Sequence, residues 1–483
     1  MTLSRRDQLR WLLAVPFAVI VGRSHAAGAD TLVGTWSGMV EDKAGRVRRF
    51  RLVITCSDVA LHAIDIGLVD AHASKVELNT PAIYVEMASL GVTVRGRLVA
   101  RDRIDAIVAS DDETQKATMR RGDLYPIISG KLPPGPMSRD DLRALLYISQ
   151  APAIGVGWAF AGAGPTVLVD GVRSLGRSTA VAEADAWHIG SNTKSMTATL
   201  VARLVEAGQL RWTTTVGDLL AQTVTDIQPD FRNATLLDLL SHHAGLPREA
   251  RKGSMPFSVG LDDARTERLA YAGLVLAQPP IAVPRTTMNY SNAGYVVVGA
   301  MLEMLMGLPW EKLIVEHVFD PLRMRSAGFG PPATLSLVDA PVGHARRRDN
   351  KLHPFTNRAV ADLPSVMGPA GLVHVSLADL LVYLEAHRDR PEQFLTKAGW
   401  ASLQTPAFGD GYALGWGVDR HGSLSHSGSN GMWLTNVSVD RPSGMVFAGA
   451  VNAATPQSVS VLQQASEAAL LSGESSVPEA KVT

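Results

Sequence analysis

The heptapeptide HIGSNTK, residues 188–194, organises the rest of this sequence. It precedes a segment whose apolar residues recur with helical spacing, at Leu200, Val201, Leu204 and Val205. Ser191 is therefore predicted to lie at a helix N-terminus, with Lys194 three residues later on the same face. A serine hydroxyl is a poor nucleophile unless a base lies beside it, and an unprotonated lysine is such a base. The alternative is structural, with Ser191 as a helix cap and Lys194 as a solvated residue of the first turn.

Two later motifs carry further reactive side chains. Tyr290-Ser291-Asn292 stands directly before a predicted helix that starts near Ala293. The segment SHSGS, residues 425–429, ends a predicted strand. The three motifs lie far apart in the chain, so only the fold can bring a hydroxyl, an amine, a phenol and an imidazole into one site.

The order Ser-x-x-Lys, Tyr-x-Asn, His-Ser-Gly resembles that of the serine β-lactamase-like, penicillin-binding hydrolases. This family includes class C β-lactamases, D,D-peptidases, D-aminopeptidases and family VIII esterases. Four other stretches are similar to the family, namely LLSHHAGLP (239–247), FDPLRM (319–324), GPAGL (368–372) and GYALGW (411–416). The second departs from the family pattern, because Arg323 stands where the family has glycine. Over residues 138–470 the resemblance implies an α+β, beta-lactamase/transpeptidase-like domain, in which helices flank an antiparallel sheet and a helical subdomain is added.

The resemblance also implies roles for single residues. Ser191 would attack a carbonyl and become acylated, and Lys194 and Tyr290 would share its proton, either of them being the base. A lowered pKa of Tyr290 would require nearby cations, which Lys194 and a protonated His426 would supply. Asn292 would hydrogen-bond the substrate amide and Lys194. The expected substrate-binding strand residues, including a backbone N–H of the oxyanion hole, are His426, Ser427, Gly428 and Ser429. No metal or cofactor is implied.

His426 also bears on the substrate. Class C β-lactamases usually carry lysine there, and a histidine is only partly charged at neutral pH. We therefore expect a serine hydrolase of peptides that contain D-amino acids, or of small amides or esters, with cell-wall fragments among the candidates. A β-lactamase is the first alternative. An inactive relative that binds peptidoglycan or a protein partner is the second.

Residues 31–123 show a different pattern. Short segments of alternating polarity, separated by Gly, Asp, Asn and Pro, predict a small all-β barrel or sandwich. Gly34-Thr35-Trp36 faintly resembles the opening of lipocalin-type barrels, in which the indole plugs the floor. A Pro- and Gly-rich linker is predicted at 124–137, followed by the hydrolase domain at 138–470 and a polar tail at 471–483. Within the hydrolase domain, strands are predicted at both ends and helices between them.

The first residues have the pattern of an export signal. Arg5-Arg6 precedes an apolar run at 11–22, and small residues follow up to 29. The run is short for a spanning helix, so we expect no stable membrane anchor; an uncleaved anchor is the alternative. The paired arginines resemble a twin-arginine signal, with a general secretory signal as the alternative, and either predicts a periplasmic protein.

The charge and cysteine content narrow the functional classes further. The chain has 483 residues, with 46 Lys and Arg against 46 Asp and Glu. This balance gives no electrostatic reason to bind nucleic acid. The single cysteine, Cys56, excludes an internal disulfide and cysteine-based metal clusters.

Overall fold

The computed structural model describes residues 31–41, 47–55, 58–63, 68–88, 91–110, 113–122, 135–250, 258, 263–334, 336–347, 351–357 and 361–474. The predicted export signal (1–29), most of the predicted linker (124–137) and Cys56 lie outside these residues. Helix α13 (Ser458–Glu474) runs into the predicted polar tail (471–483), whose remainder also lies outside.

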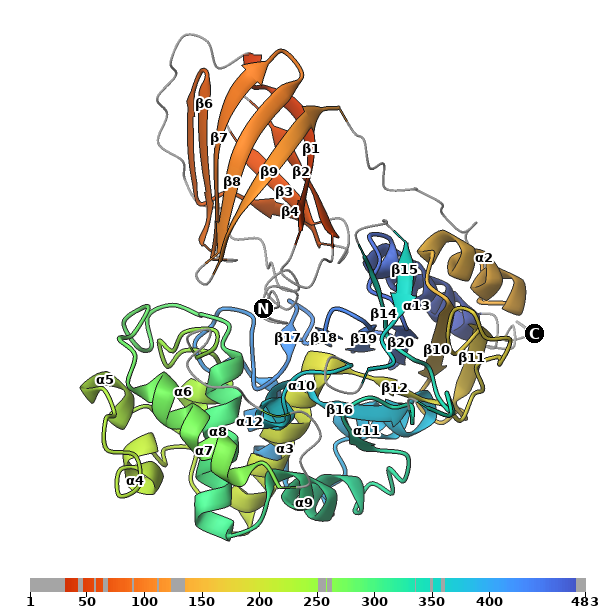
Figure 1. Ribbon diagram of the computed structural model, residues 1–483. Helices are drawn as coiled ribbons and strands as arrows, with labels where there is room; N and C mark the ends of the chain where they lie inside the picture. Colours follow the sequence, from red (N-terminus) through yellow and green to blue (C-terminus); the bar gives the residue numbers. More distant parts are fainter. Residues whose placement is uncertain are drawn as a thin grey trace, which may run out of the picture.

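The N-terminal domain is an antiparallel sheet of short strands (Figure 1). In the described residues its spatial order is β4-β3-β2-β1-β9-β8-β7-β6-β5. The strands are β1 (Gly34–Glu41), β2 (Val47–Ile54), β3 (Val59–Ala63), β4 (Leu68–His72), β5 (Lys75–Asn79), β6 (Ala82–Met87), β7 (Val92–Ala100), β8 (Arg103–Ser110) and β9 (Glu113–Arg121). Strands that are consecutive in the chain pair with each other, except β4 and β5, which lie at the two ends of this order; β1 pairs in addition with β9.

The sheet closes on itself through its two end strands. β4 and β5 are consecutive in sequence, and only Ala73 and Ser74 separate them. Ala73 N–H donates to the Val59 carbonyl of β3, while Ser74 N–H donates to the Glu86 carbonyl of β6. One bent segment therefore pairs on both sides, which makes the domain a barrel rather than a sandwich.

Side chains fill the barrel interior. Strand β6 alternates between exposed and buried positions, as a strand with one inward face requires. Trp36 is fully buried, and its indole N–H donates to the Leu32 carbonyl. The guanidinium of Arg121 lies 4.3 Å from the Trp36 ring centroid and donates to the Val33 carbonyl. These contacts of Arg121 hold β9 against β1 at one end of the barrel.

The second domain is built on a six-stranded antiparallel sheet of order β11-β10-β20-β19-β18-β17. Its strands are β10 (Ala153–Ala159), β11 (Thr166–Gly171), β17 (Gly417–Val418), β18 (Leu424–Ser429), β19 (Leu434–Val439) and β20 (Val446–Val451). The first strand of the domain, β10, therefore pairs with the last, β20. The predicted strands at both ends of the domain are confirmed, and they share one sheet.

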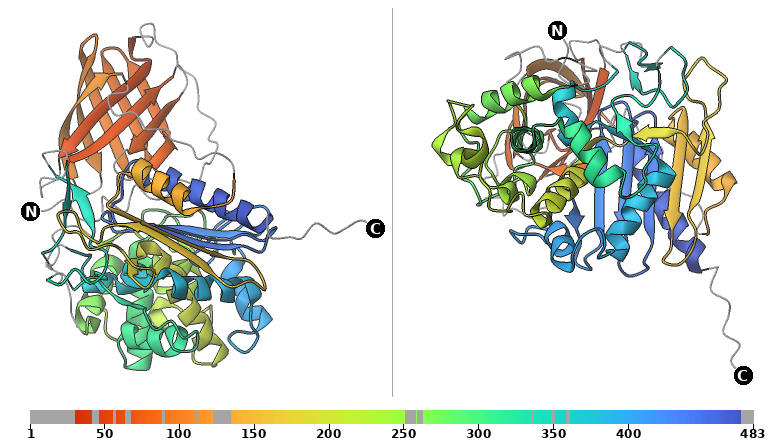
Figure 2. Two further views of the ribbon diagram at one scale, coloured as in Figure 1. Left: turned by 90° about the vertical axis from the view of Figure 1, so that its right-hand side faces the viewer. Right: turned by 90° about the horizontal axis from the view of Figure 1, so that it is seen from below.

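Helices cover both faces of this sheet (Figure 2). α2 (Arg139–Ser149) and α13 pack on one face around a cluster that includes Leu145, Phe447 and Val461. α11 (Leu377–Asp389) and α3 (Thr193–Glu206) belong to the larger core on the other side. The other helices of the domain are α4 (Val216–Leu220), α5 (Pro229–Arg232), α6 (Leu236–Leu240), α7 (Arg265–Leu276), α8 (Asn292–Met306), α9 (Trp310–Ile314), α10 (Gly368–Gly371) and α12 (Lys397–Gln404).

Two small sheets complete the described part of the domain. β12 (Ala186–His188), β16 (Val373–Ser376) and β13 (Gly328–Phe329) form one, and β14 (His344–Arg346) with β15 (Leu352–Pro354) forms the other. Strand β12 leads directly into the HIGSNTK segment, so its pairing with β16 fixes where that segment begins.

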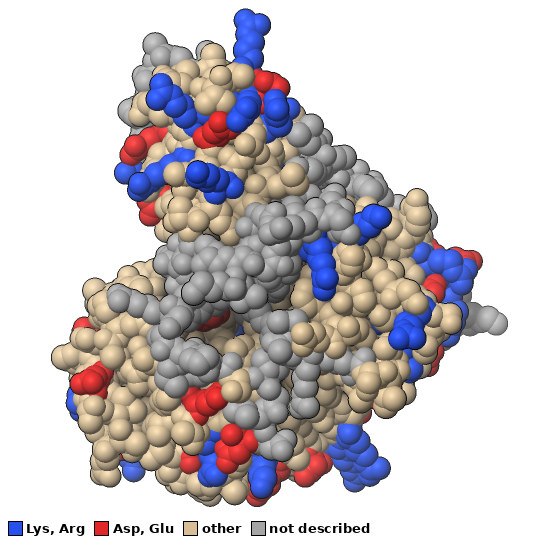
Figure 3. Space-filling model, in the orientation of Figure 1, with Lys and Arg blue, Asp and Glu red and all other residues tan. Residues whose placement is uncertain are grey.

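Two features bear on the environment of the protein. On the face shown in Figure 3, Lys and Arg side chains are interspersed with Asp and Glu, in keeping with zero net charge. Among the described residues no single helix has both the length and the apolarity to cross a bilayer; Asn292–Met306 and Trp310–Phe319 meet those criteria only as a pair bent by 86°.

Candidate active site

Ser191 lies in a tight 3-10 turn, Gly190–Asn192, that runs straight into α3. The turn is held from both sides by its neighbours. Thr193 Oγ1 donates to the Gly190 carbonyl, and Asn192 Nδ2 donates to the carbonyls of Ile189 and Thr435. Ser191 is 3% exposed. The sequence thus predicted the place of this serine correctly, at the start of a helix.

Lys194 is fully buried beside that serine. Its Nζ lies 3.2 Å from Ser191 Oγ and donates to the Ala370 carbonyl at 2.7 Å. Burial lowers the pKa of Lys194 well below its usual value; the Arg248 guanidinium lowers it further and Glu249 opposes the shift. The alternative in which Lys194 is a solvated first-turn residue is therefore wrong. An unprotonated amine beside a hydroxyl can accept its proton.

Tyr290 precedes α8 and turns its ring toward Lys194. Lys194 Nζ is 4.9 Å from the ring centroid, and the Arg248 guanidinium is 5.1 Å from it. Burial raises the pKa of the Tyr290 phenol, and the Ser191 hydroxyl and Arg248 offset only part of that rise. The expected lowering of this pKa is not seen. In this environment Tyr290 is a neutral phenol that can donate a proton.

His426, on β18, reaches the same cluster, with its ring centroid 6.5 Å from that of Tyr290. Burial and then Lys194 lower the pKa of His426 to about 3. The expected protonated imidazole is therefore corrected to a neutral one, because burial disfavours the charged form of the ring.

A hydrogen-bonded chain sets the proton position on His426. Ser291 N–H donates to His242 Nδ1, so His242 carries its proton on Nε2, which lies 3.2 Å from the Tyr412 hydroxyl. Tyr412 can then donate to His426 Nε2, 3.4 Å away, which leaves the His426 proton on Nδ1. His242 holds this position with φ of +67°, a conformation that non-glycine residues rarely adopt. Tyr412 is thus part of the site rather than general core packing.

The end of β18 and the Ser191 turn touch through two glycines. A Cβ on Gly428 would lie 2.0 Å from the Ile189 carbonyl oxygen and 2.7 Å from Ser191 N. A Cβ on Gly190, whose φ is +52°, would lie 2.3 Å from Ser429 N. Only glycine permits this approach, which gathers the backbone amides of Ser191 and Ser429 in one place. Ser427, the strand residue before Gly428, is half-buried.

Asn292 has a different partner from the one expected. It is 1% exposed, and its side chain contacts Glu249 rather than Lys194: Nδ2 donates to Glu249 Oε1 at 3.0 Å. A carboxylate only accepts hydrogen bonds, so the Asn292 atom that faces it must be the N–H₂ group. Asn292 Oδ1 is buried and has no hydrogen-bond partner among the residues that the structure describes.

A second network of polar contacts, which the sequence did not reveal, supports the Gly190–Asn192 turn. Gly190 N–H donates to His188 Nδ1, and His188 Nε2 lies 3.0 Å from Asp362 Oδ2. Asp362 Oδ1 in turn accepts from Asn430 Nδ2, just after β18. His188, Asp362 and Asn430 are all buried, so this network ties the two backbone segments of the site together. Nothing local in the sequence marks it, since its members come from three separate regions.

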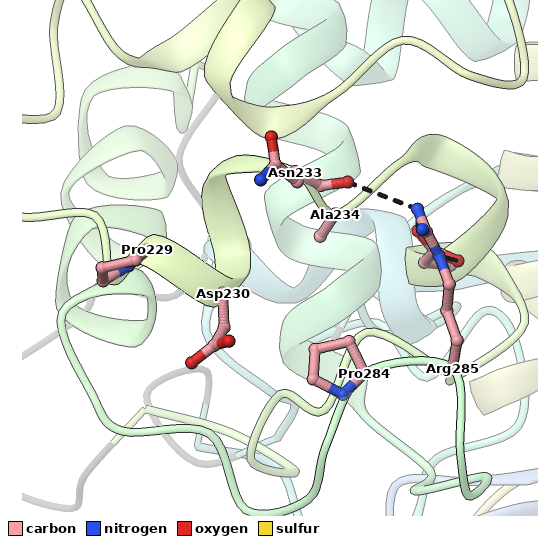
Figure 4. A pocket seen from close by; sticks show the side chains of 7 residues that line it. Pro229, Asp230, Asn233, Ala234, Pro284 and Arg285 are labelled. Atoms are coloured by element: carbon pink, nitrogen blue, oxygen red, sulfur yellow. Dashed lines mark hydrogen bonds and ion pairs between the residues drawn. The ribbon is translucent and has the colours of Figure 1, made fainter.

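His243 does not belong to this cluster. His242 and His243 diverge, because His243 Nε2 lies 3.1 Å from Asp410 while His242 contacts Tyr412. Among the described residues no group of three His, Cys, Asp or Glu side chains could hold a metal ion. An open pocket of about 400 Å³ lies elsewhere, beside the Asp238–Arg285 ion pair (Figure 4). None of the site residues described above lines it.

Comparison with known proteins agrees with this geometry. The family model described as Beta-lactamase matches residues 145–470. Penicillin-binding protein 4 of Amycolatopsis lactamdurans is 28% identical over 299 residues, which is 58% of this chain and 76% of that protein.

Two solved structures share the fold. The octameric penicillin-binding protein homologue from Pyrococcus abyssi has a TM-score of 0.55 and 22% identity, over 68% of this chain and 77% of that one. The D-amino acid amidase from Ochrobactrum anthropi SV3 has a TM-score of 0.56 and 18% identity, over 68% and 98%. The matched region contains the Ser191, Tyr290 and His426 motifs, and the chain belongs to the beta-lactamase family.

Proposed function

We propose that this protein is an exported serine hydrolase that works through an acyl-enzyme on Ser191, most readily on amides, esters or peptides of D-amino acids. One observation carries the proposal: a fully buried lysine amine lies 3.2 Å from a serine hydroxyl, in surroundings that lower the lysine pKa. An amine kept neutral in this way is the base that the serine lacks.

The proposed first half-reaction follows from these positions. Lys194 Nζ accepts the Ser191 proton while Oγ forms a bond to the substrate carbonyl carbon. The charge that develops on the carbonyl oxygen meets the Ser191 and Ser429 amides, which the two glycine contacts bring together. The carbon–nitrogen or carbon–oxygen bond then breaks, and the leaving group takes the proton back from Lys194, directly or through the Tyr290 hydroxyl.

The second half-reaction reverses these transfers with water. Lys194, neutral again, accepts a proton from water as its oxygen attacks the acyl carbon. The ester bond to Oγ breaks, Ser191 regains a proton, and the acid product leaves. Because the raised pKa of Tyr290 keeps its phenol protonated, we assign the base role to Lys194 and a proton-donor role to Tyr290.

The choice of substrate class rests on His426. Its pKa of about 3 means that it offers a neutral N–H and no charge to a substrate carboxylate. This favours amides and esters over β-lactams, which carry a carboxylate. One of the solved structures of this fold is named a D-amino acid amidase, which supports the D-amino acid preference.

A labelling experiment tests the acyl-enzyme. A fluorophosphonate should add one group to the wild-type protein and to Ser425→Ala, which alters an exposed serine on the same strand, but none to Ser191→Ala. The same three proteins should then be assayed with D-aminoacyl anilides, p-nitrophenyl esters, D-Ala-D-Ala peptides and nitrocefin. Labelling that persists in Ser191→Ala would reject the assignment. Nitrocefin as the best substrate would favour a β-lactamase.

The periplasmic location is supported by the pattern of residues 1–29. Two fusions test the export route, one of residues 1–29 to green fluorescent protein and one to alkaline phosphatase. The first should fluoresce at the cell periphery only if the twin-arginine route exports the fluorescent protein already folded. Activity of the alkaline phosphatase fusion without peripheral fluorescence of the other fusion would indicate the general secretory route. Retention of both fusions in the cytoplasm would contradict export.

A further inference from the structure

A fully buried arginine on α7 holds the segment that carries the hydrogen-bond acceptor of Lys194. Arg268 Nη2 donates to the Ser365 carbonyl at 3.1 Å, and its Nε donates to the Val366 carbonyl at 3.3 Å. These carbonyls open a 3-10 turn that leads directly into α10. In α10 the Ala370 carbonyl accepts from Lys194 Nζ. Arg268 and Lys194 therefore bind opposite ends of one short helical segment.

The segment has little room to move between these two contacts. The Pro369 carbonyl accepts from Thr197 Oγ1 on α3 at 2.8 Å. A Cβ on Gly299 of α8 would lie 2.4 Å from Pro369 Cγ, so the proline ring packs directly on the helix backbone. Because close-packed groups transmit a displacement, a shift at the Arg268 end moves the Ala370 carbonyl as well.

The position of the Ala370 carbonyl decides how the lysine amine is oriented. A neutral amine has two N–H groups and one lone pair. When Lys194 donates one N–H to Ala370, its lone pair is free to face Ser191 Oγ, 3.2 Å away. The backbone of the segment also lies beside the nucleophile, since a Cβ on Gly371 would be 3.8 Å from Ser191 N. A misplacement of about 1 Å at such a site can cost about a hundredfold in rate.

Two carboxylates hold the same guanidinium. Arg268 Nη1 donates to Glu303 on α8, and Nη2 donates to Glu311 Oε1 on α9 at 2.6 Å. Glu303 Oε1 also accepts from the Trp310 N–H at 2.8 Å. The planar guanidinium donates in several fixed directions at once, which a lysine ammonium cannot do. Arg268 thus joins three helices to the segment that contacts Lys194.

We propose that Arg268 is a positioning residue for the catalytic base: it sets the place of the Ala370 carbonyl and thereby the orientation of the Lys194 amine. The inference rests on the proposed hydrolase function and deepens it. Buried ion pairs usually contribute little net stability, so holding a position accounts better for the two carbonyl contacts of this arginine.

A conservative substitution of the arginine tests this role. Arg268→Lys keeps the charge that Glu303 and Glu311 require but loses the planar fork. It should lower kcat by roughly ten- to a hundredfold and leave KM within about threefold. A carbonyl acceptor favours the ammonium form, so loss of the Ala370 contact should lower the pKa of Lys194 and move the acid limb of kcat/KM by about one unit to lower pH. Unchanged kcat and pH profile in a folded Arg268→Lys protein would overturn the inference.

Arg388→Lys is the matched control. Arg388 is a largely buried arginine on α11, and its guanidinium likewise donates to two carbonyls and two carboxylates, those of Ala159, Gly444, Glu385 and Asp389. Its substitution should lower the unfolding temperature but leave kcat and the pH profile unchanged. The same shift of the pH profile in both variants would mean that lost stability alone produces it, and would also overturn the inference.

Gly299→Ala reaches the same segment from α8 and leaves the charges in place. The added methyl carbon would start 2.4 Å from Pro369 Cγ and must push the proline ring away from the helix. A crystal structure of this variant should place the Ala370 carbonyl oxygen more than about 3.5 Å from Lys194 Nζ, and kcat should fall at least about tenfold. An unmoved carbonyl, or a moved carbonyl with wild-type kcat, would contradict the proposed role.

Gly273→Ala, on the same helix as Arg268, is the control for this variant. A Cβ there meets only Val224, at 3.6 Å, so kcat should stay at the wild-type value. Failure of the hydrolase function has a different signature: wild-type protein that neither turns over substrates nor reacts with a fluorophosphonate would reject that function alone. The distance from Ala370 to Lys194 in Gly299→Ala would then still decide whether the segment positions the amine.

Discussion

Gly428→Ala should disable the site by moving the two proposed oxyanion amides apart. The added methyl carbon would start 2.0 Å from the Ile189 carbonyl oxygen and 2.7 Å from Ser191 N. Ordinary contact begins at 3.4 Å, so strand β18 and the Ser191 turn must separate by about 1.4 Å. Oxyanion donors act over 2.7–3.1 Å, so a shift of this size removes at least one of them and should reduce kcat by about a hundred- to a thousandfold.

Stability should suffer far less than activity. Overpacking of this kind costs about 1–3 kcal/mol, which is less than the about 5–15 kcal/mol by which folded proteins are usually stable. Gly164→Ala, where a Cβ would meet nothing within 4 Å, is the matched control and should keep wild-type activity. The assay is kcat on the best chromogenic substrate, with thermal unfolding measured on the same samples. A folded Gly428→Ala protein that retains kcat within about threefold of wild type would refute the proposed role of this contact.

Three further changes follow from the structure. Lys194→Met should abolish fluorophosphonate labelling and reduce kcat by about a hundred- to ten-thousandfold. The unfolding temperature should stay equal or rise, because an apolar chain of similar length replaces a buried amine. A loss of stability as large as that caused by a core cavity would contradict this. Arg323→Gly should raise the free energy of unfolding by about 0.5–1 kcal/mol, since Arg323 has φ of +57°, and denaturant titration that shows a loss would refute the strain. Burial lowers the pKa of His387 to about 3, so the unfolded chain binds a proton below pH 6.5 that the folded chain does not, and stability falls on acidification between those values. His387→Gln should therefore lose about 2 kcal/mol less than wild type between pH 7 and pH 5 in urea unfolding, and an unchanged pH dependence would exclude this histidine as a source.

Much of the fold could be predicted because local patterns and global packing agree. Alternating polarity in β6 and the helical stripe after Lys194 follow the periods of a strand and a helix. The choice between barrel and sandwich could not be made from these patterns. It depends on Ala73 and Ser74, whose amides pair with different strands, and the sequence around them shows only an ordinary strand break.

The active site likewise has features that the sequence predicts and features that depend on residues distant in the chain. The spacing of Ser191 and Lys194 already indicates a nucleophile with its base, the family resemblance implies the role of Tyr290, and the structure brings the three side chains together. The protonation states were not accessible, because they depend on burial by residues distant in sequence. His426 was expected to be charged and is neutral for this reason. The Asn292–Glu249 contact could not be predicted either, because the two residues lie 43 positions apart in the chain and only the fold brings them together.

The pairing of β10 with β20 has a consequence for how the protein is made. A ribosome releases β10 long before β20, and Ser191 with its lysine lies between them. Until β20 has been translated, β10 lacks one of its two neighbours in the sheet, and α13 is not yet there to pack on the face that it shares with α2. Nascent chains should therefore be inactive until β20 has been made, and a premature stop codon anywhere before β20 should yield no hydrolase at all.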